Sequence, residues 1–252
     1  PYCEVEAVDR MIALAKAAGK APLYIVHVSA KESVDLIREA RKAGDTVFGE
    51  TCPQYLVLDE SRYDDPEEGL KFILSPPLRA KEHQAAIWEG IKDGTLQVIA
   101  TDHCSFDYHG DKQNGKDDFT KCPNGAPGVE TRMPIVFSEG VSKGRMSLNK
   151  FAAVTSTNPA KIFGMYPKKG VLAVGSDADI VLMNPDMEVT ITKNILHENV
   201  DYTPYEGIKV KGWPVMTMVR GQVVVENERL QVPLGFGRYI YRKPVQYTEL
   251  LK

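Results

Sequence analysis

The sequence predicts an α/β protein in which a parallel sheet with crossover helices is followed by a smaller all-β part. Over the first 102 residues, stretches of helical periodicity alternate with short apolar runs rich in β-branched and aromatic residues. Such runs are too short for helices and are typical of buried strands. After residue 170 the helical periodicity gives way to short β-rich runs. A chain of 252 residues has room for one or two domains of this kind.

The first predicted helix and strand lie close to the start of the chain. Val5, Val8 and Ile12 recur at helical spacing, and Gly19 is expected to end this helix. The apolar run 23–26 that follows is predicted to be a buried strand.

The second helix has a predicted cap at its start. Ser29 and Glu32 have the S-x-x-E spacing of a capping box, in which the serine hydroxyl accepts a backbone N–H of the first turn. We therefore expect a helix over residues 31–43, ended by Gly44, and a second strand over residues 46–50.

A third helix and strand complete the alternation. The helix is expected over residues 81–93 and should bury Ala85, Trp88 and Ile91 on one face, and the strand is expected over residues 96–100. Strands that alternate with helices in this way are parallel and are joined by right-handed crossovers.

The segment 103–135 differs in character from what precedes it. It is long, polar and rich in glycine, and a loop of this length in a compact domain is usually functional or disordered. Helical segments are expected over residues 134–142 and 148–155, followed by a short helix that ends at Gly164.

Residues 170–230 are interpreted as a small all-β layer or sandwich. Arg220 and Gly221 are expected to form a tight hairpin turn between two of its β-rich runs. From Pro233 onward the chain is rich in aromatic residues and proline without an amphipathic period, and we expect this tail to dock on a partner subunit.

Composition excludes several functional classes. The chain has 31 basic and 34 acidic residues and a formal net charge of −3, which excludes a basic nucleic-acid scaffold and an acidic disordered tail. It has no apolar stretch long enough to span a membrane. Four scattered cysteines without C-x-x-C spacing favour a reducing, cytoplasmic setting over disulfides. The segment PYCEVEAVDR does not have the pattern of a signal peptide, and the start at Pro1 indicates processing or a piece of a longer chain.

Polar side chains follow each of the three predicted parallel strands. These candidate residues are His27, Glu50, Asp102 and His103. Working residues in parallel α/β folds lie at the carboxyl ends of strands, and a buried carboxylate beside imidazole nitrogen suits Zn²⁺ or a similar divalent ion. Catalytic zinc normally has three protein ligands, so further ligands must come from elsewhere. The other histidines, His83, His109 and His197, are expected to be solvated.

Six runs occur in a fixed order along the chain: IVHVS, GETCPQYLVLD, SPPLR, TDHCSFDYHGDK, PNGAPGVETR and KKGVLAVGSDADIVLMNP. Together they resemble the C-terminal half of a cyclic amidohydrolase of the dihydropyrimidinase and hydantoinase branch. GETCPQYL followed by TDHCSFD favours this branch over the dihydroorotases. The collapsin-response-mediator relatives share the fold without the metal ligands, whereas this chain has both His27 and Asp102.

The resemblance implies a (β/α)₈ barrel with a metal centre at its C-terminal mouth, and a β-sandwich built from both chain ends. Residues 1–165 would hold the last three barrel strands, residues 166–230 would form part of the sandwich, and residues 231–252 would be the docking tail. The resemblance also implies a homotetrameric assembly and a role in pyrimidine catabolism.

The same resemblance assigns roles to individual residues. His27 matches the metal-binding histidine of the sixth strand and Asp102 the aspartate that ends the eighth, so both are expected to project into one mouth and share a metal centre. Ser75 and Asn124 match positions whose backbone groups hold the cyclic imide or ureide of the substrate. The implied cofactor is a pair of divalent metal ions, Zn²⁺ by donor chemistry, bridged in the family by a carboxylated lysine that this chain lacks.

The implied reaction opens the ring amide of dihydropyrimidines or hydantoins, giving ureido or N-carbamoyl acids. A metal-activated hydroxide would attack the carbonyl, and Asp102 would act first as general base and then as general acid. His103 and Cys104 beside it are interpreted as packing and orienting residues. The family's H-x-H pair and other ligands lie on strands absent here, so we expect an inactive fragment. The alternatives are another ring amidohydrolase, such as an allantoinase or a dihydroorotase, or a non-catalytic scaffold.

Overall fold

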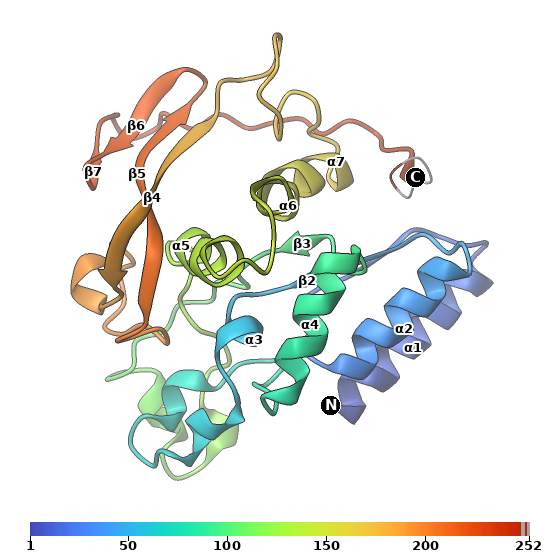
Figure 1. Ribbon diagram of the computed structural model, residues 1–252. Helices are drawn as coiled ribbons and strands as arrows, with labels where there is room; N and C mark the ends of the chain where they lie inside the picture. Colours follow the sequence, from blue (N-terminus) through green and yellow to red (C-terminus); the bar gives the residue numbers. More distant parts are fainter. Residues whose placement is uncertain (248–249, 251–252) are drawn as a thin grey trace.

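The computed structural model describes residues 1–247 and 250, which form an α/β part followed by a twisted antiparallel sheet (Figure 1). The α-helices are α1 (Tyr2–Ala17), α2 (Lys31–Lys42), α3 (Gln54–Val57), α4 (Glu82–Asp93), α5 (Arg132–Val136), α6 (Leu148–Ala152) and α7 (Asn158–Ile162). The strands are β1 (Leu23–Ile25), β2 (Val47–Thr51), β3 (Val98–Ile99), β4 (Ile180–Thr190), β5 (Lys209–Val219), β6 (Gln222–Glu226) and β7 (Arg229–Leu230). None of the described helices is long and apolar enough to cross a membrane.

The first three strands form a parallel sheet in the order β1-β2-β3, as the alternation of helices and strands predicts. Leu23 lies opposite Val47, and Glu50 lies opposite Val98. The prediction that β1 is buried is wrong: its residues are half-buried, and the adjoining Val26 is 45% exposed. The reason is that β1 pairs only with β2 and so forms an edge of the sheet.

The two faces of this sheet are covered by different elements. Helices α1, α2 and α4 lie on one side of the sheet, and α7 lies on the other (Figure 1). Val47 and Ile99 belong to the main hydrophobic core, which also contains residues of α1, α2 and α4. Phe48 and Val98 instead pack with Ile162 of α7 in a separate cluster. This alternation follows from the period of two along a strand.

The start of α2 does not use the predicted capping box. Neither Ser29 nor Glu32 caps the helix, whose N-cap residue is Ala30 and has no side-chain cap hydrogen bond. The Ser29 hydroxyl donates instead to the carboxylate of Glu4, and that carboxylate also accepts the Ser29 and Ala30 backbone N–H groups at 3.0 Å. A carboxylate from α1 therefore takes the place of the local cap.

Helix α4 buries Ile91 as predicted, but not the other two residues of the predicted face. Its buried residues are His83, Ile87, Gly90 and Ile91. Ala85 is exposed and Trp88 only half-buried, because the buried face of the helix is displaced by one residue, toward Ile87 and Gly90. The expectation that His83 is solvated is also wrong, since its Nδ1 accepts the Lys31 backbone N–H at 3.0 Å. His83 thus satisfies a further donor at the start of α2.

The last four strands form one antiparallel sheet in the order β4-β5-β6-β7. β4 and β5 are each 11 residues long, and a hairpin joins β5 to β6 through Arg220 (φ 51°) and Gly221 (φ 79°). Positive φ at both central residues is typical of the turns that match strand twist, so the predicted hairpin is confirmed. Besides this sheet and the parallel sheet, the described residues contain no further sheet that could complete a sandwich.

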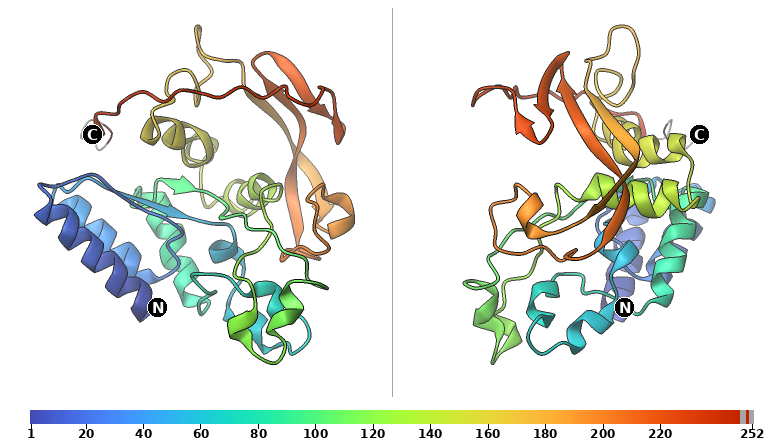
Figure 2. Two further views of the ribbon diagram at one scale, coloured as in Figure 1. Left: turned by 180° about the vertical axis from the view of Figure 1, so that it is seen from behind. Right: turned by 60° about the vertical axis from the view of Figure 1, so that its left-hand side comes forward.

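The C-terminal tail runs back across the molecule toward α7 (Figure 2). The Lys243 backbone N–H donates to the Gly164 carbonyl at 2.9 Å, and the ring centroids of Tyr247 and Phe48 are 5.9 Å apart. The tail therefore contacts its own α/β part. Docking of the tail on a partner subunit stays a prediction, and its last residues, 248–249 and 251–252, lie outside the described part.

Candidate functional site

His27 and Asp102 lie just beyond the carboxyl ends of β1 and β3. Because the strands are parallel, both residues lie at the same end of the sheet, the edge formed by the carboxyl ends of its strands. Both have left-handed backbone conformations, with φ 41° at His27 and 50° at Asp102. Such conformations are uncommon outside glycine, although His and Asp adopt them more readily than most residues, and they cluster at functional sites. The backbone therefore turns sharply at both predicted metal ligands.

Glu50 of β2 lies between these two residues. Its carboxylate accepts the Tyr24 hydroxyl at 2.6 Å. Burial raises the pKa of Glu50, the hydrogen bond from Tyr24 and the nearby His27 lower it, and the charge of Asp102 adds to the rise. The three side chains thus share one electrostatic environment. The sequence predicts that Glu50 ends a strand but predicts no role for it.

The donor set of a metal centre is only partly present. Imidazole nitrogen from His27 and carboxylate oxygen from Asp102 are donors that suit Zn²⁺. Within the described part of the chain, no group of three or more His, Cys, Asp or Glu side chains could hold a metal ion. Since catalytic zinc normally takes three protein ligands, His27 and Asp102 fit such a site but do not complete it.

Ser75 and Asn124, the two predicted substrate-binding residues, are brought together from positions 49 residues apart. The Ser75 hydroxyl donates to the Asn124 side-chain oxygen at 3.1 Å, and both residues are exposed. Ser75 and His27 also line a common cavity of about 500 Å³ beside β1, whose other walls come mainly from apolar side chains of α1 and β1. One predicted metal ligand and one predicted substrate contact therefore face the same space.

His103 is engaged by the backbone. Its Nδ1 accepts the Gly128 N–H at 3.0 Å and the Val129 N–H at 3.3 Å. Cys104 is a free, exposed cysteine. Backbone donors therefore occupy this ring nitrogen, and a packing and orienting role for His103 and Cys104 stays a prediction.

The two remaining histidines, His109 and His197, have exposed side chains. His109 is exposed, as predicted. His197 is also mainly exposed, and its Nδ1 lies 2.8 Å from Glu130, whose hydrogen bond raises the pKa of His197.

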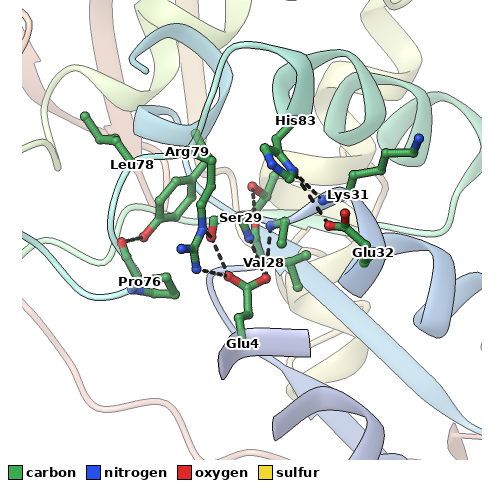
Figure 3. A network of polar contacts seen from close by, with 12 residues as sticks. Glu4, Val28, Ser29, Lys31, Glu32, Pro76, Leu78, Arg79 and His83 are labelled. Carbon is green, nitrogen blue, oxygen red and sulfur yellow. Dashed lines mark hydrogen bonds and ion pairs between the residues drawn. The ribbon is translucent and has the colours of Figure 1, made fainter. Parts of the chain in front are cut away.

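A buried polar network connects the His27 loop with the Ser75 loop (Figure 3). Glu4 of α1 pairs with Arg79 at 3.1 Å, and the Arg79 Nε donates to the Ser29 hydroxyl at 3.0 Å. The side chains of Glu4 and Arg79 are only 10% and 14% exposed. Ser29 follows His27 by two residues and Arg79 follows Ser75 by four, so one network supports both loops. No local sequence pattern predicts this network, because its members are far apart in the chain.

The chain matches the model of the amidohydrolase family over residues 12–224. A D-hydantoinase of Geobacillus stearothermophilus is 49% identical to it over 243 residues. That match covers 96% of this chain and 51% of the relative, so the chain spans about half the length of the curated relatives it matches.

Solved structures give the same result. The crystal structure of a dihydropyrimidinase from Brevibacillus agri is 50% identical and superimposes with a TM-score of 0.94, covering 96% of this chain and 52% of that one. An L-hydantoinase (dihydropyrimidinase) from Arthrobacter aurescens is 38% identical with a TM-score of 0.87, covering 94% of this chain and 52% of that one.

Proposed function

Because the chain belongs to the amidohydrolase family, we propose that the full-length protein hydrolyses the ring amide of dihydropyrimidines or hydantoins. The observation that carries the proposal is the pair His27 and Asp102, both with left-handed backbone at one edge of a parallel sheet. Relatives about half identical in sequence are named for hydantoins, which supports this substrate class. In this proposal the chain is the C-terminal half of the enzyme, with the last barrel strands and part of a β-sandwich, and the enzyme is a cytoplasmic homotetramer.

His27 and Asp102 would hold part of the metal centre in this proposal, and the remaining ligands would come from outside this chain. Divalent metals at such a centre polarise the ring carbonyl and lower the pKa of water. Zn²⁺ is the ion that imidazole and carboxylate donors favour among those consistent with this chemistry.

Asp102 performs the proton transfers. It accepts a proton from the attacking water as the oxygen–carbon bond forms, and it delivers that proton to the amide nitrogen as the carbon–nitrogen bond breaks. The backbone groups of Ser75 and Asn124 hold the imide or ureide of the ring during this exchange. The hydrogen bond between their side chains, at 3.1 Å, supports a shared role in binding.

The test is a ring-opening assay of the purified full-length protein with dihydrouracil, hydantoin, dihydroorotate and allantoin. We expect turnover of dihydrouracil or hydantoin and its loss in Asp102→Asn, because an amide cannot shuttle the proton. Asp107→Asn, an exposed residue of the same loop, is the matched control. Turnover of Asp102→Asn within about tenfold of the unmodified protein, or about 1.4 kcal/mol in barrier, would place the base elsewhere.

Metal analysis separates the enzyme from its alternatives. We expect His27→Ala to lower the bound divalent metal, whereas His109→Ala, in the exposed loop, should not. Turnover only of dihydroorotate or allantoin would identify another ring amidohydrolase. A full-length protein with no bound metal and no turnover would be a scaffold.

A further inference from the structure

Lys112 is a fully buried lysine in the long loop after β3. It begins a single 3₁₀ turn, Lys112–Gly115, and its relative exposure is 0%. Lysine is almost never fully buried unless it is paired. No carboxylate lies within ion-pair distance of Lys112 in the described residues, and the nearest aromatic ring, Phe106, is 5.9 Å away. Its ammonium must therefore be satisfied by neutral acceptors.

Those acceptors are two backbone carbonyls from different loops. The Lys112 Nζ donates to the Ile73 carbonyl and to the Pro123 carbonyl, each at 2.7 Å. Ile73 precedes Ser75 by two residues, and Pro123 comes directly before Asn124. Lys112 thus holds the two chain segments that carry the predicted substrate contacts.

Further contacts close the same junction. The Gly125 backbone N–H donates to the Ile73 carbonyl at 3.1 Å, so this oxygen accepts from both the lysine and the opposite loop. Two residues after Ile73, the Ser75 hydroxyl donates to the Asn124 side-chain oxygen at 3.1 Å. Gly115 packs against Cys122 so closely that a Cβ on it would lie 2.4 Å from the Cys122 Cβ. The turn that carries Lys112 therefore contacts the segment just before Asn124.

Stability alone does not account for an ammonium at this position. Burial lowers the pKa of Lys112 to about 8, which means that the protein disfavours its charged form. An apolar side chain of similar length would avoid the cost of burying an ammonium, at the expense of the two hydrogen bonds to the Ile73 and Pro123 carbonyls. The contribution of the lysine is therefore to the geometry of the two loops.

We propose that Lys112 is a positioning residue for substrate binding. Its ammonium binds the Ile73 and Pro123 carbonyls, and it thereby fixes the separation of the nearby Ser75 and Asn124 backbones. The inference rests on the proposed function, in which these backbones hold the imide or ureide of the ring. Loss of the lysine would let the two loops separate, which weakens binding without removing the proton-transfer group or a metal ligand.

The first test compares Lys112→Met with the unmodified full-length protein, using dihydrouracil and hydantoin. Methionine keeps a long unbranched side chain but has no donor. We expect KM to rise about tenfold or more while kcat and bound metal stay within about threefold, because uniform binding is lost and the chemical step is not. The exposed Lys116→Met, four residues away, is the matched control and should leave both constants unchanged.

Thermal unfolding distinguishes positioning from a general structural role. We expect the unfolding midpoint of Lys112→Met to fall only slightly, because the two lost hydrogen bonds and the avoided burial of an ammonium act in opposite directions. A lower midpoint with an unchanged KM, or a fall in kcat with an unchanged KM, would overturn the proposal. Lys112→Gln retains two donors with shorter reach, and an intermediate KM is expected for it. Failure of both variants to fold would also overturn the proposal, because the lysine would then be a folding requirement.

Amide hydrogen exchange gives a readout that does not depend on activity. In Lys112→Met we expect the Gly125 amide to exchange at least about tenfold faster, since exchange reports local opening. Unchanged exchange there would refute the positioning role even in an active enzyme. Absence of ring opening by the unmodified protein would refute the proposed function, and the exchange experiment would still decide whether Lys112 holds the two loops.

Discussion

Replacing Glu4 with alanine should loosen the start of α2 and the loop that carries His27. The Glu4 carboxylate accepts the Ser29 and Ala30 backbone N–H groups at 3.0 Å and pairs with Arg79 at 3.1 Å. Removing it leaves two backbone donors without their acceptor and leaves Arg79, 14% exposed, without its carboxylate.

The expected cost follows from this burial. Removing one partner of a buried ion pair costs about 3–5 kcal/mol, because the other charge is left uncompensated. A free-energy change of this size speeds local opening by about two to three and a half orders of magnitude, since each 1.4 kcal/mol is about tenfold.

Hydrogen exchange at the Ser29 and Ala30 amides measures this opening in the full-length protein. The matched control is Glu6→Ala on the same helix, whose partner Arg10 lies 3.4 Å away and where both side chains are more than 60% exposed. Exposed pairs of this kind contribute little, so the control should exchange at the unmodified rate. Exchange in Glu4→Ala that matches the control would refute the structural role of the network.

The same network should respond to pH. Burial raises the pKa of Glu4, but hydrogen bonds from Ser29 and Ala30 lower it by more, so the folded pKa lies below the ordinary value of 4.5. A group with a lowered folded pKa stabilises above its unfolded pKa, and this stability is lost as pH falls through the folded value. Protection of Ser29 and Ala30 should therefore weaken below about pH 4.5. In Glu4→Gln this dependence should be absent, and an unchanged dependence would assign the titration to another group.

Three further outcomes are expected. Gly212 has φ 103°, and a Cβ on it would lie 2.1 Å from the Phe137 ring, so Gly212→Ala should destabilise the fold by more than about 3 kcal/mol. The control Gly221→Ala, whose Cβ would have nothing within 4 Å, should cost only about 1 kcal/mol. Equal midpoints of thermal unfolding for the two variants would contradict this. The isolated 252-residue chain should associate in light scattering through the half-buried edge of β1 and should not open dihydrouracil or hydantoin; a monodisperse, active monomer would contradict this. Tyr247→Ala should speed hydrogen exchange in the preceding tail residues, since its ring packs on Phe48; unchanged exchange would show that the contact does not hold the tail.

Much of the candidate site could be predicted because it depends on strand direction. Helix–strand alternation predicts parallel strands, and parallel strands bring their carboxyl ends to one edge. His27 and Asp102 lie at that edge for this reason. The assignment of Ser75 and Asn124 to one site followed only from the family resemblance, because no local pattern relates residues 49 positions apart.

The sequence by itself determined the features that depend on neighbouring residues. Helical and strand periodicity, the glycine after α4, and the turn at Arg220 and Gly221 are set by backbone conformations within a few residues. The predicted ends of the first three strands differ from the observed ones by two residues at most. Local energies suffice for these features because their partners lie in the same turn or the same hairpin.

Only the tertiary structure decided which polar groups are buried and what satisfies them. Ser29 has the spacing of a cap, yet its hydroxyl is bound by Glu4, 25 residues away. His83 lies in a charged segment, yet it is buried against the start of α2, 52 residues away. Lys112 lies in a polar loop, yet it binds the carbonyl of Ile73, 39 residues away. A buried polar group must find a partner wherever packing places one, and packing is a property of the whole fold that no short window of sequence contains.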